Sequence, residues 1–156
     1  MSPRRMALAA ALTVALAGCG GSGSSSSSSS GITPSAYRAS VNKLCAAYNN
    51  SIRALPKSTT SSISGLTTLA NSAKNALAQI RSVTPPSGMS AAVNKWIAQL
   101  QQQEDNVAKL LAAFKSGDTA QLRSIAAQGT KLNAQSNAQA QSLGLPSCAQ
   151  NATPSG

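Results

Sequence analysis

The sequence predicts an all-α fold, an antiparallel up-down-up-down four-helix bundle over residues 32–148. Apolar residues recur there at intervals of three and four along four successive stretches, which is the period of an amphipathic helix. Proline or glycine separates each stretch from the next, and no stretch alternates apolar and polar residues as a half-exposed strand does. Because the connections are short, each helix is expected to lie antiparallel to the next.

The first two helices are expected between residues 33 and 85. Thr33 is the predicted N-cap of the first helix, Pro34 suits its first turn, and Pro56 ends it. The second helix is expected to begin within residues 58–61 and to end at the proline pair 85–86. The stripes expected to face the core are Tyr37, Val41, Leu44, Tyr48, Ile52 and Leu55 in the first helix, and Ile63, Leu66, Leu69, Ala73, Leu77, Ile80 and Val83 in the second.

The third and fourth helices are expected on either side of a Gly-Asp turn. The third begins near Ser90 and ends at Gly117, and Asp118 caps the fourth, with Gln121 three residues later as in a capping box. Glycine and proline at 144–146 supply the C-terminal stop. Their core stripes are Val93, Trp96, Ile97, Leu100, Val107, Leu110, Leu111 and Phe114, and Leu122, Ile125, Ala126, Leu132, Ala140 and Leu143.

Residues 1–18 have the three-part pattern of an export signal. Arg4 and Arg5 give a positive start, and the apolar run over residues 6–17 is shorter than the roughly 20 residues that span a bilayer. The run ends in a sequence that resembles the lipobox of bacterial lipoproteins, made of Leu16, Ala17, Gly18 and Cys19. General secretion and twin-arginine export both fit this segment, and an ordinary secretory signal in which the cysteine is incidental is the alternative.

The resemblance implies a lipid-anchored protein. It implies cleavage after Gly18, a diacylglyceryl thioether on Cys19, and a further acyl chain such as palmitate on the new amine. Two or three acyl chains hold a protein firmly, because each buried methylene contributes about 0.8 kcal/mol. Residues 20–31 contain only glycine and serine, so residues 19–31 are expected to form a flexible tether with a reach of roughly 20 Å. The expected location is the cell membrane, with the chain exposed on its extracytoplasmic side.

Cys45 and Cys148 remain once Cys19 carries the lipid. In an exported protein, such an even pair favours a disulfide. The segment after the fourth helix can double back along the first helix toward Cys45, and closing a loop of about 100 residues would stabilise the fold by roughly 4.7 kcal/mol. A redox-active or metal-binding pair is the alternative, but the two cysteines lack Cys-x-x-Cys spacing and the sequence has no histidine.

The residue types present disfavour an enzyme. The 156 residues include 0 His and 3 Asp+Glu, so Ser-His-Asp or Cys-His machinery and histidine metal sites cannot be assembled, and carboxylate dyads are nearly impossible. We therefore expect no catalytic residue, no metal and no cofactor.

Basic residues outnumber acidic ones in the mature chain. Loss of Arg4 and Arg5 reduces the 13 basic residues to 11, which against 3 acidic residues gives a side-chain charge of +8. The basic residues are scattered and lack interleaved aromatic residues, so nucleic acid is not an expected partner. Contact with anionic lipid or an acidic cell-wall polymer is one interpretation of the charge, and solubility alone is the other. The sequence does not indicate a protein partner.

Polar residues interrupt the apolar stripe of the third helix at Gln103 and Glu104. In the expected bundle this level meets Gly129 and Asn133 of the fourth helix and Ala70 of the second. Small residues then face long polar ones. The favoured interpretations are a buried polar layer that fixes the helix register, and a Glu104 side chain that reaches solvent at the edge of the stripe. A ligand cavity lined by Gln103, Glu104 and Asn133 is the alternative.

The mature chain resembles small helical exported lipoproteins of high-GC Gram-positive bacteria that have no assigned activity. The shared features are a cysteine in the first helix, a proline pair before the third, the Gly-Asp turn, and the Leu-Gly-Leu-Pro-Ser-Cys ending at residues 143–148. These features are structural, so the resemblance carries no catalytic residue across. Residues 149–156 are expected to form a disordered tail.

Three functional hypotheses follow. The leading one is a non-enzymatic, membrane-anchored cell-envelope lipoprotein with a binding or structural role. The first alternative is a small-ligand carrier or sensor module that uses the polar layer inside the bundle. The second alternative is a cationic domain that contacts anionic lipid or a cell-wall polymer. A sizeable cavity would favour the small-ligand carrier, and a fully packed core would favour the lipoprotein with a binding or structural role.

Overall fold

The structure is a computed structural model that describes residues 31–150, and within this range it contains helices and no strand. The predicted all-α fold is therefore confirmed. The four long helices are α1 (Pro34–Arg53), α2 (Ile63–Ser82), α3 (Ser90–Ser116) and α4 (Thr119–Ser142). Three short 3-10 turns accompany them: η1 (Lys57–Ser61), η2 (Ser87–Met89) and η3 (Pro146–Ala149).

Side-chain caps begin α1 and α4 where the sequence predicts them. Thr33 Oγ1 accepts a hydrogen bond from the Ala36 amide at 3.2 Å, and Asp118 Oδ1 accepts one from the Gln121 amide at 2.9 Å. Each bond satisfies a backbone N–H that has no partner within its own helix. Local residue pairs thus determine where these two helices start.

The second helix begins later than the predicted start at residues 58–61. These residues form η1, and α2 starts after Ser62, whose Oγ accepts a hydrogen bond from the Gly65 amide at 3.1 Å. Serine and threonine side chains compete for nearby backbone groups, which weakens a helix in this run. Gly65 is needed at the reversal, because a Cβ there would overlap the backbone of Thr59.

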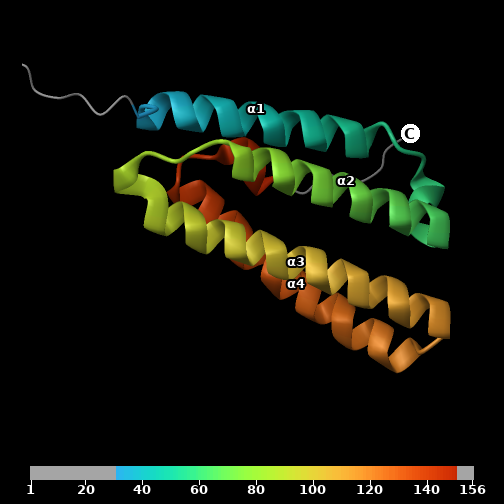
Figure 1. Ribbon diagram of the computed structural model, residues 1–156. Coiled ribbons are helices and arrows are strands. Elements are labelled where there is room, and N and C mark those ends of the chain that lie inside the picture. The colour runs from blue at the N-terminus through green and yellow to red at the C-terminus, as the bar shows by residue number, and fades with distance from the viewer. Residues whose placement is uncertain (1–30, 151–156) are drawn as a thin grey trace, which may run out of the picture.

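Helices that follow one another in the chain contact one another. α1 contacts α2, α2 contacts α3, and α3 contacts α4. Figure 1 shows α1 and α2 on one side of the molecule and α3 and α4 on the other. η3 contacts both α1 and α4, so the C-terminal segment connects the first long helix to the last.

The apolar core is concentrated at one end of the molecule. This is the end where α1 and α3 begin and where α2 and α4 finish, on the left in Figure 1. The largest fully buried side chains there are Trp96, Tyr37, Leu145, Val41 and Val93. The predicted stripes therefore supply the core, together with a leucine from beyond the fourth helix.

Three residues of the predicted stripes are exposed instead of buried: the small Ala126 and two large side chains, Ile63 and Phe114. Ile63 is 43% exposed and Phe114 is 38% exposed. Ile63 begins α2 and Phe114 lies in the last turn of α3, so both are at the end opposite the core. Apolar periodicity identifies the inner side of a helix but not how far along the helix the core extends.

The segment after α4 turns back toward α1. Gly144 has a φ of +75°, the left-handed conformation that ends many helices. Beyond it, Leu145 is fully buried in the core. Ala149, one residue after Cys148, belongs to η3 and packs against the same core.

Side chains of α1 bind the backbone of this segment. Arg38 Nε donates to the Leu143 carbonyl at 2.8 Å, and Asn49 Nδ2 donates to the Ser147 carbonyl at 2.7 Å. Asn42 Oδ1 accepts a hydrogen bond from the Ser147 amide at 3.0 Å. These polar contacts run along one side of α1 and fix the path of the returning chain.

The predicted disulfide joins Cys45 and Cys148, with their Cα atoms 5.0 Å apart. It links the middle of α1 to η3 and closes a sequence separation of 103 residues. α2, α3 and α4 all lie inside the closed loop. The bridge therefore restricts nearly the whole helical domain when the chain unfolds.

Removal of the disulfide should destabilise the protein. The Cys45→Ser/Cys148→Ser variant loses a loop constraint, which should lower the free energy of unfolding by about 3–5 kcal/mol. Urea unfolding followed by the fluorescence of Trp96 measures this difference. The chemically reduced wild-type protein is the matched control and should unfold at the same urea concentration as the variant. An unchanged midpoint in both would contradict a constraining role for the bridge.

Candidate functional site

A partly enclosed cavity of about 450 Å³ lies between the four long helices and the C-terminal segment. Its volume is within the range of roughly 300–1,000 Å³ that is typical of small-molecule sites. The apolar part of its wall includes Leu77, Ile80, Trp96, Leu100 and Val107. The polar part, from α1, α3 and α4, includes Asn49, Gln103, Glu104, Asn106, Asn133, Ser136 and Asn137.

The structure brings the predicted polar residues together at this cavity, which is lined by Gln103, Glu104 and Asn133. Gly129 of α4 also lines it, at the level that the sequence predicts. On α2, Ala73 and Ala76 line the cavity in place of Ala70. The expected residue is about one turn away, because η1 replaces the predicted first turn of the second helix.

Gln103 connects α3 to α4 at the polar wall. Its Nε2 donates to Ser136 Oγ at 2.6 Å and to the Leu132 carbonyl at 3.1 Å. Ser136 is 2% exposed and in turn donates to the Asn133 carbonyl at 3.1 Å. The polar layer therefore fixes how α3 and α4 meet, while the cavity lies beside it.

Asn106 is a second polar residue of α3 at the cavity, and it was not among the predicted residues. It is buried, and its Nδ2 donates to the Ile125 carbonyl at 3.2 Å. A Cβ at Gly129 would lie 2.8 Å from Asn106 Oδ1, so the missing side chain at 129 leaves room for the amide. Its spacing of three residues from Gln103 is the sequence signal that places both on one helix face.

Asn49 is the polar residue that α1 contributes, and it was also not predicted. It lies four residues after Cys45 and three before Ile52, both of which are buried. This spacing could have placed Asn49 on the inner face. The prediction chose Tyr48 for the stripe, and Tyr48 is half-buried at the cavity wall.

Glu104 is the one charged residue among those that line the cavity. Its Oε2 accepts a hydrogen bond from Gln101 Nε2 at 3.0 Å. Gln101 Oε1 accepts in turn from Arg81 Nη2 of α2 at 2.6 Å. The carboxylate is half-buried and is connected to a cation only through an intervening amide.

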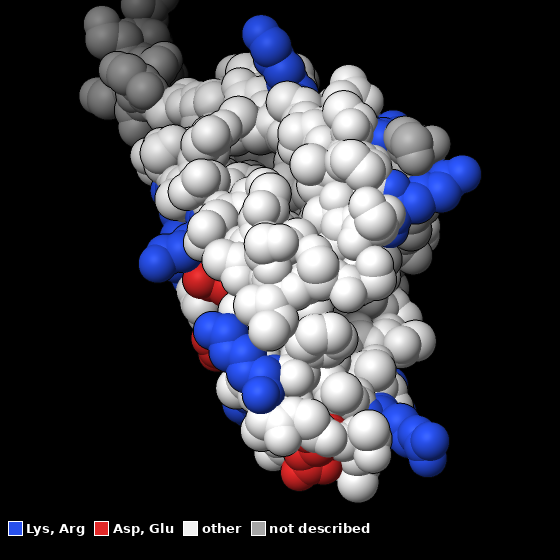
Figure 2. Space-filling model, turned by 90° about the vertical axis from the view of Figure 1, so that its right-hand side faces the viewer, with Lys and Arg blue, Asp and Glu red and all other residues white. Residues whose placement is uncertain are grey.

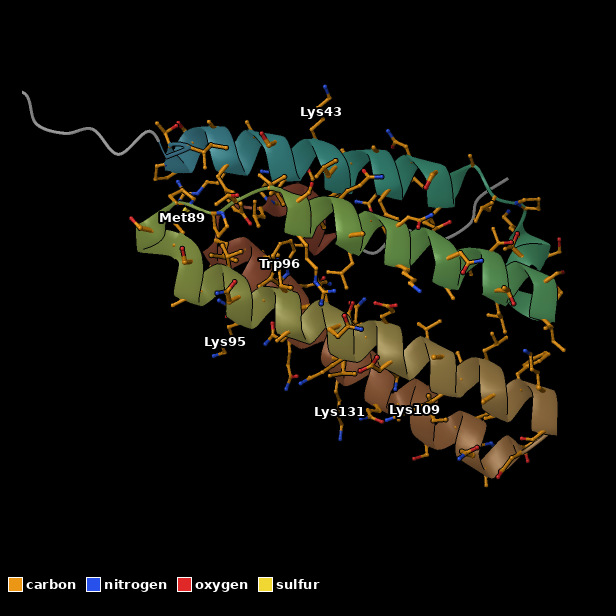
Figure 3. The ribbon with its side chains drawn as sticks, in the orientation of Figure 1. Lys43, Met89, Lys95, Trp96, Lys109 and Lys131 are labelled. Carbon is orange, nitrogen blue, oxygen red and sulfur yellow. A yellow bond between two sulfur atoms is a disulfide. The ribbon has the colours of Figure 1, made fainter. Side chains whose placement is uncertain are left out.

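Two aromatic side chains complete the wall. Trp96 is the one tryptophan of the sequence and is 1% exposed. Figure 3 shows it pointing into the space between the helices. Burial raises the pKa of the Tyr48 phenol, which keeps this group neutral at physiological pH.

Comparisons of the chain with protein-family models, curated proteins and solved structures find no match. The candidate site is therefore assessed from its own geometry and chemistry. Among residues 31–150, no helix has both the length and the apolar character needed to cross a membrane. The predicted lipidation site lies outside the described residues, at Leu16, Ala17, Gly18 and Cys19.

Basic side chains project from the surface as separate groups. On the face of the molecule in Figure 2, most Lys and Arg side chains lie at the edge, and one lies across the lower left of the face. The acidic groups are in the lower part of the same face. Figure 3 shows Lys43 pointing away from α1, and Lys95 and Lys131 pointing away from the α3–α4 side. None of these three lysines lines the cavity.

The fit between Asn106 and Gly129 can be tested with a double-mutant cycle. Alanine at 129 should gain about 1 kcal/mol of helix propensity over glycine. In the wild-type background this gain should be cancelled or reversed, because the new Cβ displaces Asn106 from the Ile125 carbonyl. In an Asn106→Ala background the obstruction is gone, and Gly129→Ala should stabilise the protein by about 1 kcal/mol. Urea unfolding of the four proteins measures the coupling, and equal effects in both backgrounds would exclude it.

Proposed function

We propose that this protein is a non-enzymatic, membrane-anchored cell-envelope lipoprotein whose helical domain binds a small ligand. The observation that carries the binding role is the cavity of about 450 Å³, which receives side chains from all four long helices. Packed protein interiors leave few voids larger than one water molecule. The cavity is far larger, and its wall combines apolar side chains with a few placed polar groups, as ligand sites do.

The same proposal includes an antiparallel up-down-up-down arrangement of the four helices. The short connections at 83–89 and 117–118 support it, because they favour antiparallel neighbours. The contacts between successive helices also support it, and η3 joins α1 to α4. In such an arrangement, small and polar residues at one level leave an internal space between the helices.

Anchoring is proposed from the N-terminal sequence, with Cys19 as the acylated residue. The Gly/Ser stretch 20–31 leads directly to Ile32, which is half-buried against the core just before α1 begins at Pro34. The folded domain therefore starts where the tether ends. Acyl chains would hold the protein at the cell membrane, and the tether would present the domain on the extracytoplasmic side.

An interaction role without a ligand is the competing proposal. Ile63 and Phe114, exposed at the end opposite the core, support it. The side-chain charge of +8, from 11 basic and 3 acidic residues, would attract anionic lipid or an acidic wall polymer within a Debye length of about 8–10 Å. These features are compatible with ligand binding. The cavity favours the carrier, because an interaction module has no need of internal space.

Replacement of the lipidated cysteine should release the protein from the membrane. Cys19→Ala removes the acylated sulfur, so the chain should leave the membrane fraction or accumulate as an uncleaved precursor. Cell fractionation and intact mass of the purified protein measure both outcomes. The Cys45→Ala/Cys148→Ala variant keeps the lipobox and should remain in the membrane fraction. A Cys19→Ala protein that is still processed and membrane-bound would refute lipid anchoring at this residue.

Filling the cavity should abolish ligand binding. Ala76 of α2 lines the cavity, so Ala76→Leu should weaken binding of 4-phenyl-1-butanol, a neutral probe that fits this volume, by about tenfold or more. Calorimetric titration of the purified lipoprotein in nanodiscs of zwitterionic lipid measures the affinity. Ala78→Leu adds the same side chain at an exposed position of the same helix and should bind like the wild type. Equal affinities in the two variants would place the probe outside the cavity.

A further inference from the structure

Three of the side-chain amides at the cavity, those of Asn49, Gln103 and Asn106, have a fixed orientation. Each donates its NH₂ group to a backbone carbonyl oxygen, which can only accept. The amide oxygen must then lie on the opposite side of the group and is the atom that the residue has left to offer. The three bonds are Asn49 Nδ2 to Ser147 O at 2.7 Å, Gln103 Nε2 to Leu132 O at 3.1 Å, and Asn106 Nδ2 to Ile125 O at 3.2 Å.

These three amide oxygens have no hydrogen-bond donor within residues 31–150. Asn49 is 3% exposed and Asn106 is 7% exposed, so bulk solvent reaches little of either side chain. A ligand that brings N–H groups to this wall would supply the donors that these oxygens lack.

The charge of the cavity has the opposite sign to the charge of the molecule. The chain outside residues 1–18 has 11 basic and 3 acidic residues, yet the one charged residue that lines the cavity is Glu104. No Lys or Arg of residues 31–150 lines it. A bound anion would face a carboxylate and three amide oxygens with no cation beside it, whereas these groups would attract a bound cation. Asn133 differs from them, because its Oδ1 accepts from Asn137 Nδ2 at 2.8 Å and its own NH₂ group is left as a donor.

Aromatic faces at the same cavity add to this preference. Trp96 and Tyr48 both line it. The face of an aromatic ring attracts an organic cation within about 6 Å of its centre, and tryptophan does so most strongly. Their apolar carbon atoms also suit the hydrocarbon part of a ligand.

We propose that the cavity selects an organic cation, with an amine or ammonium group on an apolar body. The ammonium group binds Glu104 and amide oxygens of the cavity wall within reach of its three N–H donors, and the apolar body packs against Trp96. This assignment rests on the proposed ligand-binding function and specifies the chemical class of its ligand.

The surface charge of +8 acts against a cation only at long range. Salt screens exposed charges beyond about 8–10 Å, and Lys43, Lys95 and Lys131 point away from the helices in Figure 3. At contact, the groups of the cavity wall decide the preference, because a half-buried carboxylate a few ångströms away interacts much more strongly than screened charges do. The net charge therefore slows association of a cation without reversing its preference.

A matched set of three probes tests the proposal. 4-Phenylbutylamine, 4-phenyl-1-butanol and 4-phenylbutanoate share a phenyl ring and a four-carbon chain and differ in charge. Calorimetric titration of the intact lipoprotein in zwitterionic nanodiscs should show the amine binding at least about tenfold more tightly than the butanoate, a difference of roughly 1.4 kcal/mol. Glu104→Gln should bring this ratio close to one. Asp105→Asn removes the same charge from the adjacent exposed residue, which does not line the cavity, and should keep the ratio.

The outcomes separate this proposal from the one on which it rests. Binding of the alcohol together with equal or tighter binding of the butanoate would overturn the preference for a cation and leave ligand binding intact. A ratio that survives in Glu104→Gln, or that falls equally in Asp105→Asn, would also overturn it, because the cavity carboxylate would then not be its source. Binding of none of the three probes would overturn both proposals.

Discussion

The attachment of the C-terminal segment to α1 is the interaction on which the rest of the structure depends. α1 packs against α2 on one side, and η3 is its principal contact on the other. The Cys45–Cys148 disulfide makes that second contact covalent, and the hydrogen bonds from Arg38 and Asn49 hold the backbone that leads up to Cys148. Leu145 adds a fully buried side chain. One short segment therefore closes the helical domain.

The same attachment builds the candidate site. Cys45, Cys148 and Gln150 all line the cavity, so the bridge and the residues after it form part of its wall. Asn49 contributes both to the closure of the fold and to the cavity wall. Its NH₂ group donates to the Ser147 carbonyl of the returning chain, and the residue lines the cavity. The contacts that complete the fold and the groups that would meet a ligand are thus partly the same atoms.

Features that depend on neighbouring residues could be predicted from the sequence. Thr33 and Asp118 cap their helices through bonds to amides three residues away, and the polar interruption at Gln103 and Glu104 indicated the level of the cavity. For Asn49 and Asn106, helical spacing could indicate the inner face of the helix, but it could not supply the hydrogen-bond partners that allow an amide to be buried there. Their hydrogen bonds reach carbonyl groups 98 and 19 residues away, and a polar residue on a helix signals burial only when such a distant partner is known.

The uneven distribution of buried apolar groups divides the domain into two regions of different local stability. Near the disulfide, large side chains are fully buried and the chain is cross-linked, so structure there opens only when the whole domain unfolds. Around η1 and the turn between α3 and α4, Ile63 is 43% exposed, Phe114 is 38% exposed and no bridge restrains the ends. Thermal opening is therefore expected to begin in this second region, and it would leave the covalent closure of the fold intact.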